Sequence, residues 1–144
     1  MRVRDVAAVH VGGVSGLVSL VVSGSGSLLF TLSSEWRELF ASSSTGIVQS
    51  GSLRTTVASL LLDGGAGIVD LLSGVSSQAA LLVRGGFVRV SSPSIWSAAA
   101  GISVSSSGLS VLGSGEFVMD ADSDVDGVGS LEFSASSTIT VDSS

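Results

Sequence analysis

The chain has 144 residues, of which 44% are hydrophobic and only 12% are charged, and its formal net charge is -6. The length fits one domain with its own core, although the single proline, Pro93, also allows a division into 1–92 and 94–144. So few charges predict a surface that meets protein rather than water. The absence of cysteine excludes disulfides and thiolate metal sites.

The negative charge is concentrated in the last fifth of the sequence. That segment has no Lys or Arg, and its acidic residues are Glu116, Asp120, Asp122, Asp124, Asp126, Glu132 and Asp142. An acidic segment repels phosphate, and no basic stripe with interleaved aromatic residues occurs elsewhere. We therefore expect no nucleic-acid partner.

The N-terminal segment has some features of a signal peptide. Residues 1–4 contain two arginines and precede an uncharged run over 6–34, but Asp5, His10 and recurring glycines interrupt the pattern. A spanning helix needs about 20 mainly apolar residues. We expect no cleaved signal and no membrane span; a mature N-terminus near Ser23 would instead indicate a secreted, self-assembling surface protein.

Glycines recur about every twelve to fourteen residues and predict turns between short strands. The pattern Gly-x-Gly-x-apolar occurs at 24–28, 113–117 and 127–131, which indicates degenerate internal repeats that stack or meander. Apolar and polar residues alternate in the stretches expected to form strands, which are 28–32, 102–104, 109–111, 117–121 and 131–141. The last two would form a hairpin through 124–129.

One stretch favours a helix. Residues 34–40, with Ser34 as N-cap, acidic residues in the first turn and Trp36 four residues before Phe40, predict about two helical turns. Residues 76–84 fit a helix or a strand. The fold class expected from these patterns is mainly β, with short glycine-bounded antiparallel strands in a sandwich, barrel or stacked meander and one short helix near 34–40.

The sequence lacks the motifs of common enzymes. No serine stands in Gly-x-Ser-x-Gly, and the glycine pairs lack the lysine of a phosphate-binding loop. The one histidine, His10, has apolar neighbours, as a packed strand residue would. We therefore expect a protein that is not an enzyme.

The most site-like motif is acidic. Asp122, Asp124 and Asp126 stand at alternate positions before Gly127, as the first half of a calcium loop requires. The twelfth position is Phe133 rather than an acid, however, and strands flank the motif. Two interpretations stay open: a site for calcium, the one cofactor that the motif suggests, and a solvated acidic turn.

Both tryptophans, Trp36 and Trp96, lie beside serine-rich stretches. Aromatic residues with a polar group are frequent at interfaces. Each tryptophan could therefore contact a partner or close one end of the core.

The C-terminal repeats carry a family resemblance. The sequences Gly-Ser-Gly-Glu-Phe at 113–117, Asp-Ala-Asp at 120–122 and Gly-Val-Gly-Ser-Leu-Glu-Phe-Ser-Ala at 127–135 resemble repeats of minor tail proteins from phages of GC-rich actinobacteria. The resemblance covers roughly 101–144, with an echo at 24–32. It implies a β-rich virion structural protein present in many copies, and it matches no catalytic residue.

Together with the low charge and the short strands, this resemblance implies a virion structural protein, made in the host cytoplasm, that assembles with itself and with other virion proteins. A tail-associated component is favoured, and capsid decoration and contact with a host surface stay open. The alternative is a calcium-dependent adhesive or carbohydrate-binding module, in which the three aspartates hold the ion and Trp36 or Trp96 stacks on sugar.

Overall fold

The computed structural model describes residues 2–4, 16–22, 25–134 and 137–142, and in these residues the fold is all-β, without a helix. Short strands of three to six residues follow one another, separated by corners. Because no described helix exists, none is present that could cross a membrane. The strands are β1 (Arg2–Arg4), β2 (Leu17–Val22), β3 (Leu28–Phe30), β4 (Ser34–Trp36), β5 (Glu38–Ser43), β6 (Gly46–Gln49), β7 (Leu53–Thr55), β8 (Leu60–Asp63), β9 (Ile68–Leu71), β10 (Val75–Ser77), β11 (Ala80–Arg84), β12 (Phe87–Ser91), β13 (Ser94–Ala98), β14 (Gly101–Ser105), β15 (Gly108–Leu112), β16 (Phe117–Asp120), β17 (Leu131–Phe133) and β18 (Thr138–Asp142).

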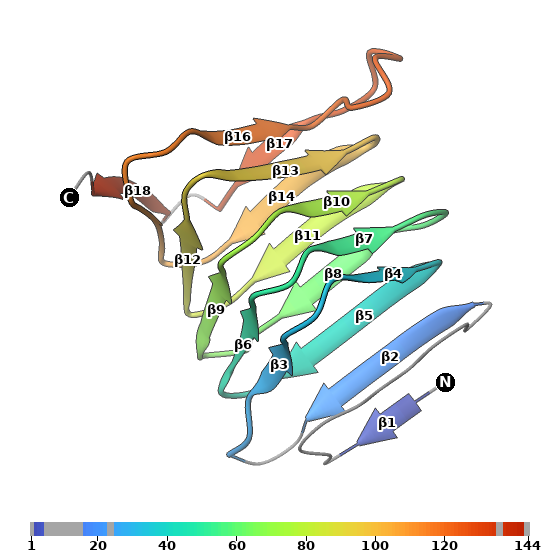
Figure 1. Ribbon diagram of the computed structural model, residues 1–144, viewed down its shortest axis with the longest axis vertical. Helices are drawn as coiled ribbons and strands as arrows, with labels where there is room; N and C mark the ends of the chain where they lie inside the picture. The colour runs from blue at the N-terminus through green and yellow to red at the C-terminus, as the bar shows by residue number, and fades with distance from the viewer. Residues whose placement is uncertain (1, 5–15, 23–24, 135–136, 143–144) are drawn as a thin grey trace.

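The strands form three parallel sheets that wind into a β-solenoid of about five turns (Figure 1). Sheet A has the order β1-β2-β5-β8-β11-β14-β17, sheet B the order β18-β15-β12-β9-β6-β3, and sheet C the order β16-β13-β10-β7-β4. Each turn contributes one strand to each sheet. The stack therefore grows along its long axis from β1 at one end to β16, β17 and β18 at the other (Figure 1).

The expected antiparallel arrangement is wrong, because every strand pairing in the described part of the chain is parallel. In sheet A the residues Leu39, Leu60, Leu81 and Ile102 pair in succession, each 21 residues after the last. The glycines mark corners, and each turn has several corners. Their spacing is therefore shorter than the true repeat, and it imitates a series of hairpins.

The expected helix over 34–40 is also wrong. Ser34–Trp36 is β4 of sheet C and pairs with β7, whereas Glu38 begins β5 of sheet A, which pairs with β2 and β8. Two helical turns are marginal on their own, so the pairing with neighbouring turns decides the conformation. The ambiguous stretch 76–84 forms strand on both sides of a short corner, within β10 and β11.

The core is the interior of the solenoid, where side chains from successive turns stack on one another. Alternate residues of each strand point inward, so that like residues lie above like residues. The interior rows of sheet A include the fully buried Leu39, Ala41, Leu60, Leu62, Leu81 and Val83. Each buried leucine contributes about 1.5–3 kcal/mol relative to an exposed one.

Close stacking also governs the corners. A Cβ at Gly67 would collide with the backbone of Thr45 in the turn below, and one at Gly51 would collide with Leu32. Hydroxyl groups connect neighbouring turns where sheets C and A meet, since the Oγ1 of Thr55 donates to the Oγ of Ser77 at 3.0 Å. Small and hydroxyl side chains therefore suit the corners of this fold.

The predicted hairpin at the C-terminal end is wrong as well. The strands β16 and β17 lie in different sheets, C and A, and residues 121–130 form the corner between them. In the preceding turn the same corner is only Ala99 and Ala100.

Pro93 lies in a corner too, between β12 and β13, and all three sheets continue past it.

Candidate functional site at the C-terminal turn

The last turn of the solenoid is built differently from those before it. We define the C-terminal turn as residues 116–142, which contain β16, β17 and β18. Each of these strands pairs with only one neighbour within the described chain: β16 with β13, β17 with β14, and β18 with β15. The C-terminal turn therefore presents the edge of all three sheets.

Its inward-facing side chains are partly open to solvent. Leu131 is 45% exposed, whereas Ile102, its neighbour one turn below, is 1% exposed. Ile139 and Val141 are 52% and 68% exposed, although Leu109 and Val111 beneath them are buried. The interior rows thus continue into the last turn, and no described residue adds a further layer above them.

An open edge with apolar residues along it is a template for another strand. Unpaired N–H and C=O groups of an edge can bond to a further chain, and the apolar rows would be buried in the same step. Monomeric proteins usually protect such edges with charges. Here Glu132 lies in β17 and Asp142 in β18, both exposed.

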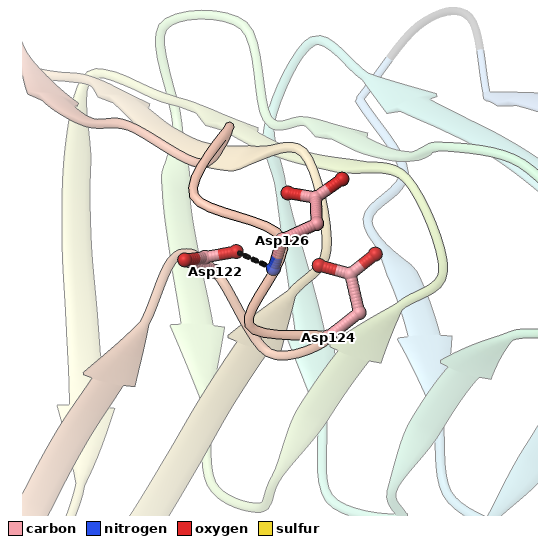
Figure 2. Close-up of side chains that lie close together, drawn as sticks. All are labelled: Asp122, Asp124 and Asp126. Atoms are coloured by element: carbon pink, nitrogen blue, oxygen red, sulfur yellow. Dashed lines mark hydrogen bonds between the residues drawn. The ribbon is translucent and has the colours of Figure 1, made fainter.

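The corner 121–130 contains the predicted acidic motif, and the structure brings its three carboxylates together. One carboxylate oxygen from each of Asp122, Asp124 and Asp126 lies within 4.8 Å of the others (Figure 2). Asp122 Oδ1 accepts a hydrogen bond of 3.1 Å from the backbone N–H of Asp126, and Asp122 Oδ2 accepts one of 3.1 Å from that of Gly127. Asp126 Oδ1 accepts from Val128 N–H at 2.8 Å.

These hydrogen bonds fold the corner through its own carboxylates. Asp124 and Asp126 are exposed, and Asp122 is partly buried. Carboxylate oxygens are ligands that calcium prefers, but exposed acidic groups at this spacing are common without an ion. The proximity of three carboxylates is thus compatible with a cation and equally with a solvated turn.

The structure places both tryptophans inside the solenoid. Trp36 lies at the end of β4, and its Nε1–H donates to Ser34 Oγ at 3.0 Å. Trp96 is fully buried in β13, and its ring meets that of Phe117 edge to face, with centroids 5.2 Å apart. Neither ring is available at the surface of this chain to stack on a sugar.

An ion pair on the outer face of sheet B was not anticipated from the sequence. Arg89 of β12 donates to Asp70 of β9 through two nitrogens: Nε lies 2.9 Å from Oδ1, and Nη2 donates to Oδ2. The hydrogen bond and the charge of Asp70 raise the pKa of Arg89 above its usual range. The sequence alone did not indicate this pair, because the two residues are 19 positions apart and become neighbours only in the register of the parallel strands β9 and β12.

His10, the one histidine, lies outside the described residues. Comparisons of the chain with protein families, with curated proteins and with solved structures found no match.

Proposed function

We propose that this protein is a structural component that assembles through the exposed end of its solenoid. The observation that carries the proposal is the C-terminal turn, in which three sheet edges and the exposed side chains of Leu131, Ile139 and Val141 lie together. Pairing with a further layer would satisfy the edge groups and bury apolar area, at about 25 cal/mol per Å². The low share of charged residues opposes such contacts little.

The assembly we propose is a virion, and the protein a tail-associated or capsid-decorating component that contacts copies of itself and other virion proteins. Support for this setting comes from the repeats at 113–117, 120–122 and 127–135, which resemble those of phage minor tail proteins. A stack of short parallel turns also suits a structural part, because every turn is held by backbone hydrogen bonds to its neighbours. The proposal assigns the protein no catalytic step.

The alternative, a calcium-dependent adhesive module, has one observation in its favour, the proximity of the carboxylates of Asp122, Asp124 and Asp126. The burial of Trp36 and Trp96 removes the aromatic platform that its sugar-binding form requires. We therefore keep the assembly as the proposed function.

Light scattering of the purified chain across a range of concentrations, with calcium and then with chelator, tests the proposal. We expect a mass well above 14.2 kDa that grows with concentration and does not change when chelator is added. A monomer at every concentration would contradict the assembly. A monomer whose melting temperature falls on adding chelator would favour the adhesive module.

A further inference from the structure

The outer face of sheet B carries apolar side chains in the middle of the solenoid. We define the lateral face as the outward side chains of β6, β9, β12 and β15. Ile68 and Phe87 are 45% and 38% exposed and pair in the register of β9 and β12, so they form a ridge. Leu72, directly after β9, is 42% exposed. Exposed apolar side chains that gather on one face mark a surface that meets protein.

The ion pair of Arg89 and Asp70 lies beside this ridge and has hydrogen-bonding capacity left over. Within the described chain Arg89 donates to Asp70 from Nε and Nη2, whereas a guanidinium has five N–H groups. Each carboxylate oxygen of Asp70 accepts one of these bonds and can accept a second. The side chain of Asp70 is only 12% exposed, so much of its desolvation is complete in the single chain. The pair is therefore prepared to bind a second pair of the same kind.

The rest of the lateral face combines large and small side chains. Three rows of outward positions cross its four strands in register. The first row is Gly46, Ile68, Phe87 and Gly108, the second is Val48, Asp70, Arg89 and Ser110, and the third is Ser50, Leu72, Ser91 and Leu112. A line that runs along the strands between β9 and β12 divides each row into two complementary halves.

A second copy fits the lateral face when it is turned over about that line as a two-fold axis. Asp70 of each copy then lies opposite Arg89 of the other, because the two residues flank the axis in neighbouring strands. The ridge residues Ile68 and Phe87 are opposed in the same way. Large side chains meet small ones elsewhere, and these opposed pairs are Val48 with Ser110, Leu72 with Ser91, and Leu112 with Ser50. Interdigitation of this kind suits two sheets packed face to face at ~10 Å.

Charge selects this arrangement over the other face-to-face one. A two-fold axis along the stack would reverse the strands of the second copy and place Asp70 opposite Asp70 and Arg89 opposite Arg89. Like charges opposed across an interface are unfavourable, whereas complementary charges fix orientation and register. The favoured contact therefore keeps the strand direction of the two B sheets and reverses the direction of the two stacks.

We infer that a second copy of the chain binds the lateral face by a two-fold contact, in which Asp70 and Arg89 of both copies form one ring of four charges. The contact joins the same surface of both copies, so it closes as a dimer. It uses no residue of the C-terminal turn and goes beyond the proposed assembly, so either can hold without the other. The four strands span roughly 300 Å² at the usual strand and residue spacings. A standard interface has ~800 Å² per partner, so the dimer should be weak.

Cross-linking between two cysteine variants tests the contact, because the natural chain has no cysteine. Val48→Cys and Ser110→Cys are purified separately, mixed at high concentration and treated with a short bifunctional thiol reagent. We expect a cross-linked dimer from the mixture, since the two positions face each other across the contact. Either variant alone should give none, because its two cysteines would be offset by about 14 Å, three strand spacings of ~4.8 Å.

The matched control uses the outer face of sheet C. Glu35 and Ser97 stand in one row of that sheet with the same separation of three strand spacings. A mixture of Glu35→Cys and Ser97→Cys should therefore give no dimer. A dimer from Val48→Cys alone would show the arrangement with reversed strands, and equal product from the two mixtures would show collisions alone. Either result would overturn the inference.

Exchange of the two charges provides a second measurement that does not require cysteine. Arg89→Asp should weaken dimerisation about tenfold or more, because four acidic groups then meet at the axis. The double variant Asp70→Arg with Arg89→Asp should dimerise as the unmodified chain does, since it keeps the pairs within and between copies. Sedimentation at several concentrations measures both variants, and thermal unfolding checks that they fold. Equal weakening in the two folded variants would overturn the ring of four charges.

The same experiments separate this contact from the assembly at the C-terminal turn. A chain that forms the cross-linked dimer and nothing larger would contradict the proposed assembly and leave the lateral contact standing. A chain that forms large species, while the mixture of Val48→Cys and Ser110→Cys gives no dimer, would overturn the lateral contact alone. A chain that stays monomeric at every concentration and gives no cross-link would contradict both.

Discussion

The middle turns and the C-terminal turn have the same strand pattern but opposite environments. Leu81 of β11 and Leu131 of β17 occupy the same interior row of sheet A. Leu81 is fully buried between turns, whereas Leu131 is exposed by nearly half. The inward direction of a side chain in a solenoid therefore does not ensure its burial, because burial needs a turn on both sides.

The middle turns and the C-terminal turn also differ in the sign of their charged residues. The middle turns have both signs, and their charged residues include the paired Arg89 and Asp70. The C-terminal turn has acidic residues alone. A turn that is open, apolar inside and of one sign can associate with a partner of complementary charge while it resists its own kind.

The largest expected effect separates the two regions at matched leucines. Leu81→Ala should lower the free energy of unfolding by about 2–5 kcal/mol, because it leaves a cavity between two turns. Leu131→Ala should cost clearly less in dilute solution, since half of its surface is already in water. Urea unfolding of both variants at low concentration measures the difference, and equal losses would contradict the distinction between closed and open turns.

Corner glycines should show a similar contrast. Gly67→Ala should cost about 3 kcal/mol, because the new methyl group would collide with Thr45 of the adjacent turn. Gly127 has φ +81° but open space around it, so Gly127→Ala should cost only about 1 kcal/mol. Thermal unfolding of the two variants tests this order, and a milder effect at Gly67 would contradict the close stacking of corners.

The ion pair between Arg89 and Asp70 should contribute less to the free energy of unfolding than the buried leucines and the corner glycines do. Asp70→Asn should lower the free energy of unfolding by about 1 kcal/mol, a value reduced by the exposure of Arg89. The more exposed pair between Arg54 and Glu35, 3.8 Å apart, provides the control, and Glu35→Gln should have no measurable effect. An equal effect of the two substitutions in urea unfolding would show that the geometry of the Arg89 pair adds nothing.

The raised pKa of Arg89 fixes the sign of one pH effect. The folded state holds the proton of Arg89 more tightly than the unfolded state does. The stabilisation that this proton gives the folded state is therefore complete below the pKa of the unfolded chain. It is lost only as the pH rises through the pKa of the folded state. Both values lie in the strongly alkaline range. The contribution of this arginine should therefore be constant through neutral pH.

The smallest expected effect is local to the acidic corner. Asp122→Ala removes the acceptor for the N–H groups of Asp126 and Gly127, so these two amides should exchange faster with solvent. Overall stability should change little, because the corner is exposed. Asp124→Ala, which removes an exposed carboxylate of the same cluster to which neither amide donates, should leave both amides protected. Equal exchange in both variants would contradict the role of Asp122.

Several strands could be predicted from the alternation of apolar and polar residues. Whether they pair in parallel or antiparallel could not. The stretches 28–32, 102–104, 109–111 and 117–121 contain the strands β3, β14, β15 and β16, as their patterns indicate. The stretch 131–141, expected as one strand, instead contains two, β17 in sheet A and β18 in sheet B. Alternation is the same for parallel and antiparallel strands, however, so it does not distinguish a solenoid from a meander. The 21-residue spacing of Leu39, Leu60, Leu81 and Ile102 is a sequence signal that would have revealed the repeat.

The false helix and the acidic motif show two further limits. Residues 34–40 satisfy the local rules for a helix start, yet pairing with strands 19 or more residues away overrides them. The acidic motif could be found from spacing alone, because its residues are close in sequence. The exposure of the C-terminal turn could not be predicted in this way, because the exposure of Leu131 depends on whether another strand covers it.

Amide hydrogen exchange measured at increasing protein concentration tests the central claim most directly. We expect the amides of β17, Leu131–Phe133, to become protected as concentration rises, while those of β11, Ala80–Arg84, stay protected throughout. That result would show that the open turn is covered by association. Exchange in β17 that is independent of concentration, in a range where the middle turns stay folded, would contradict the account.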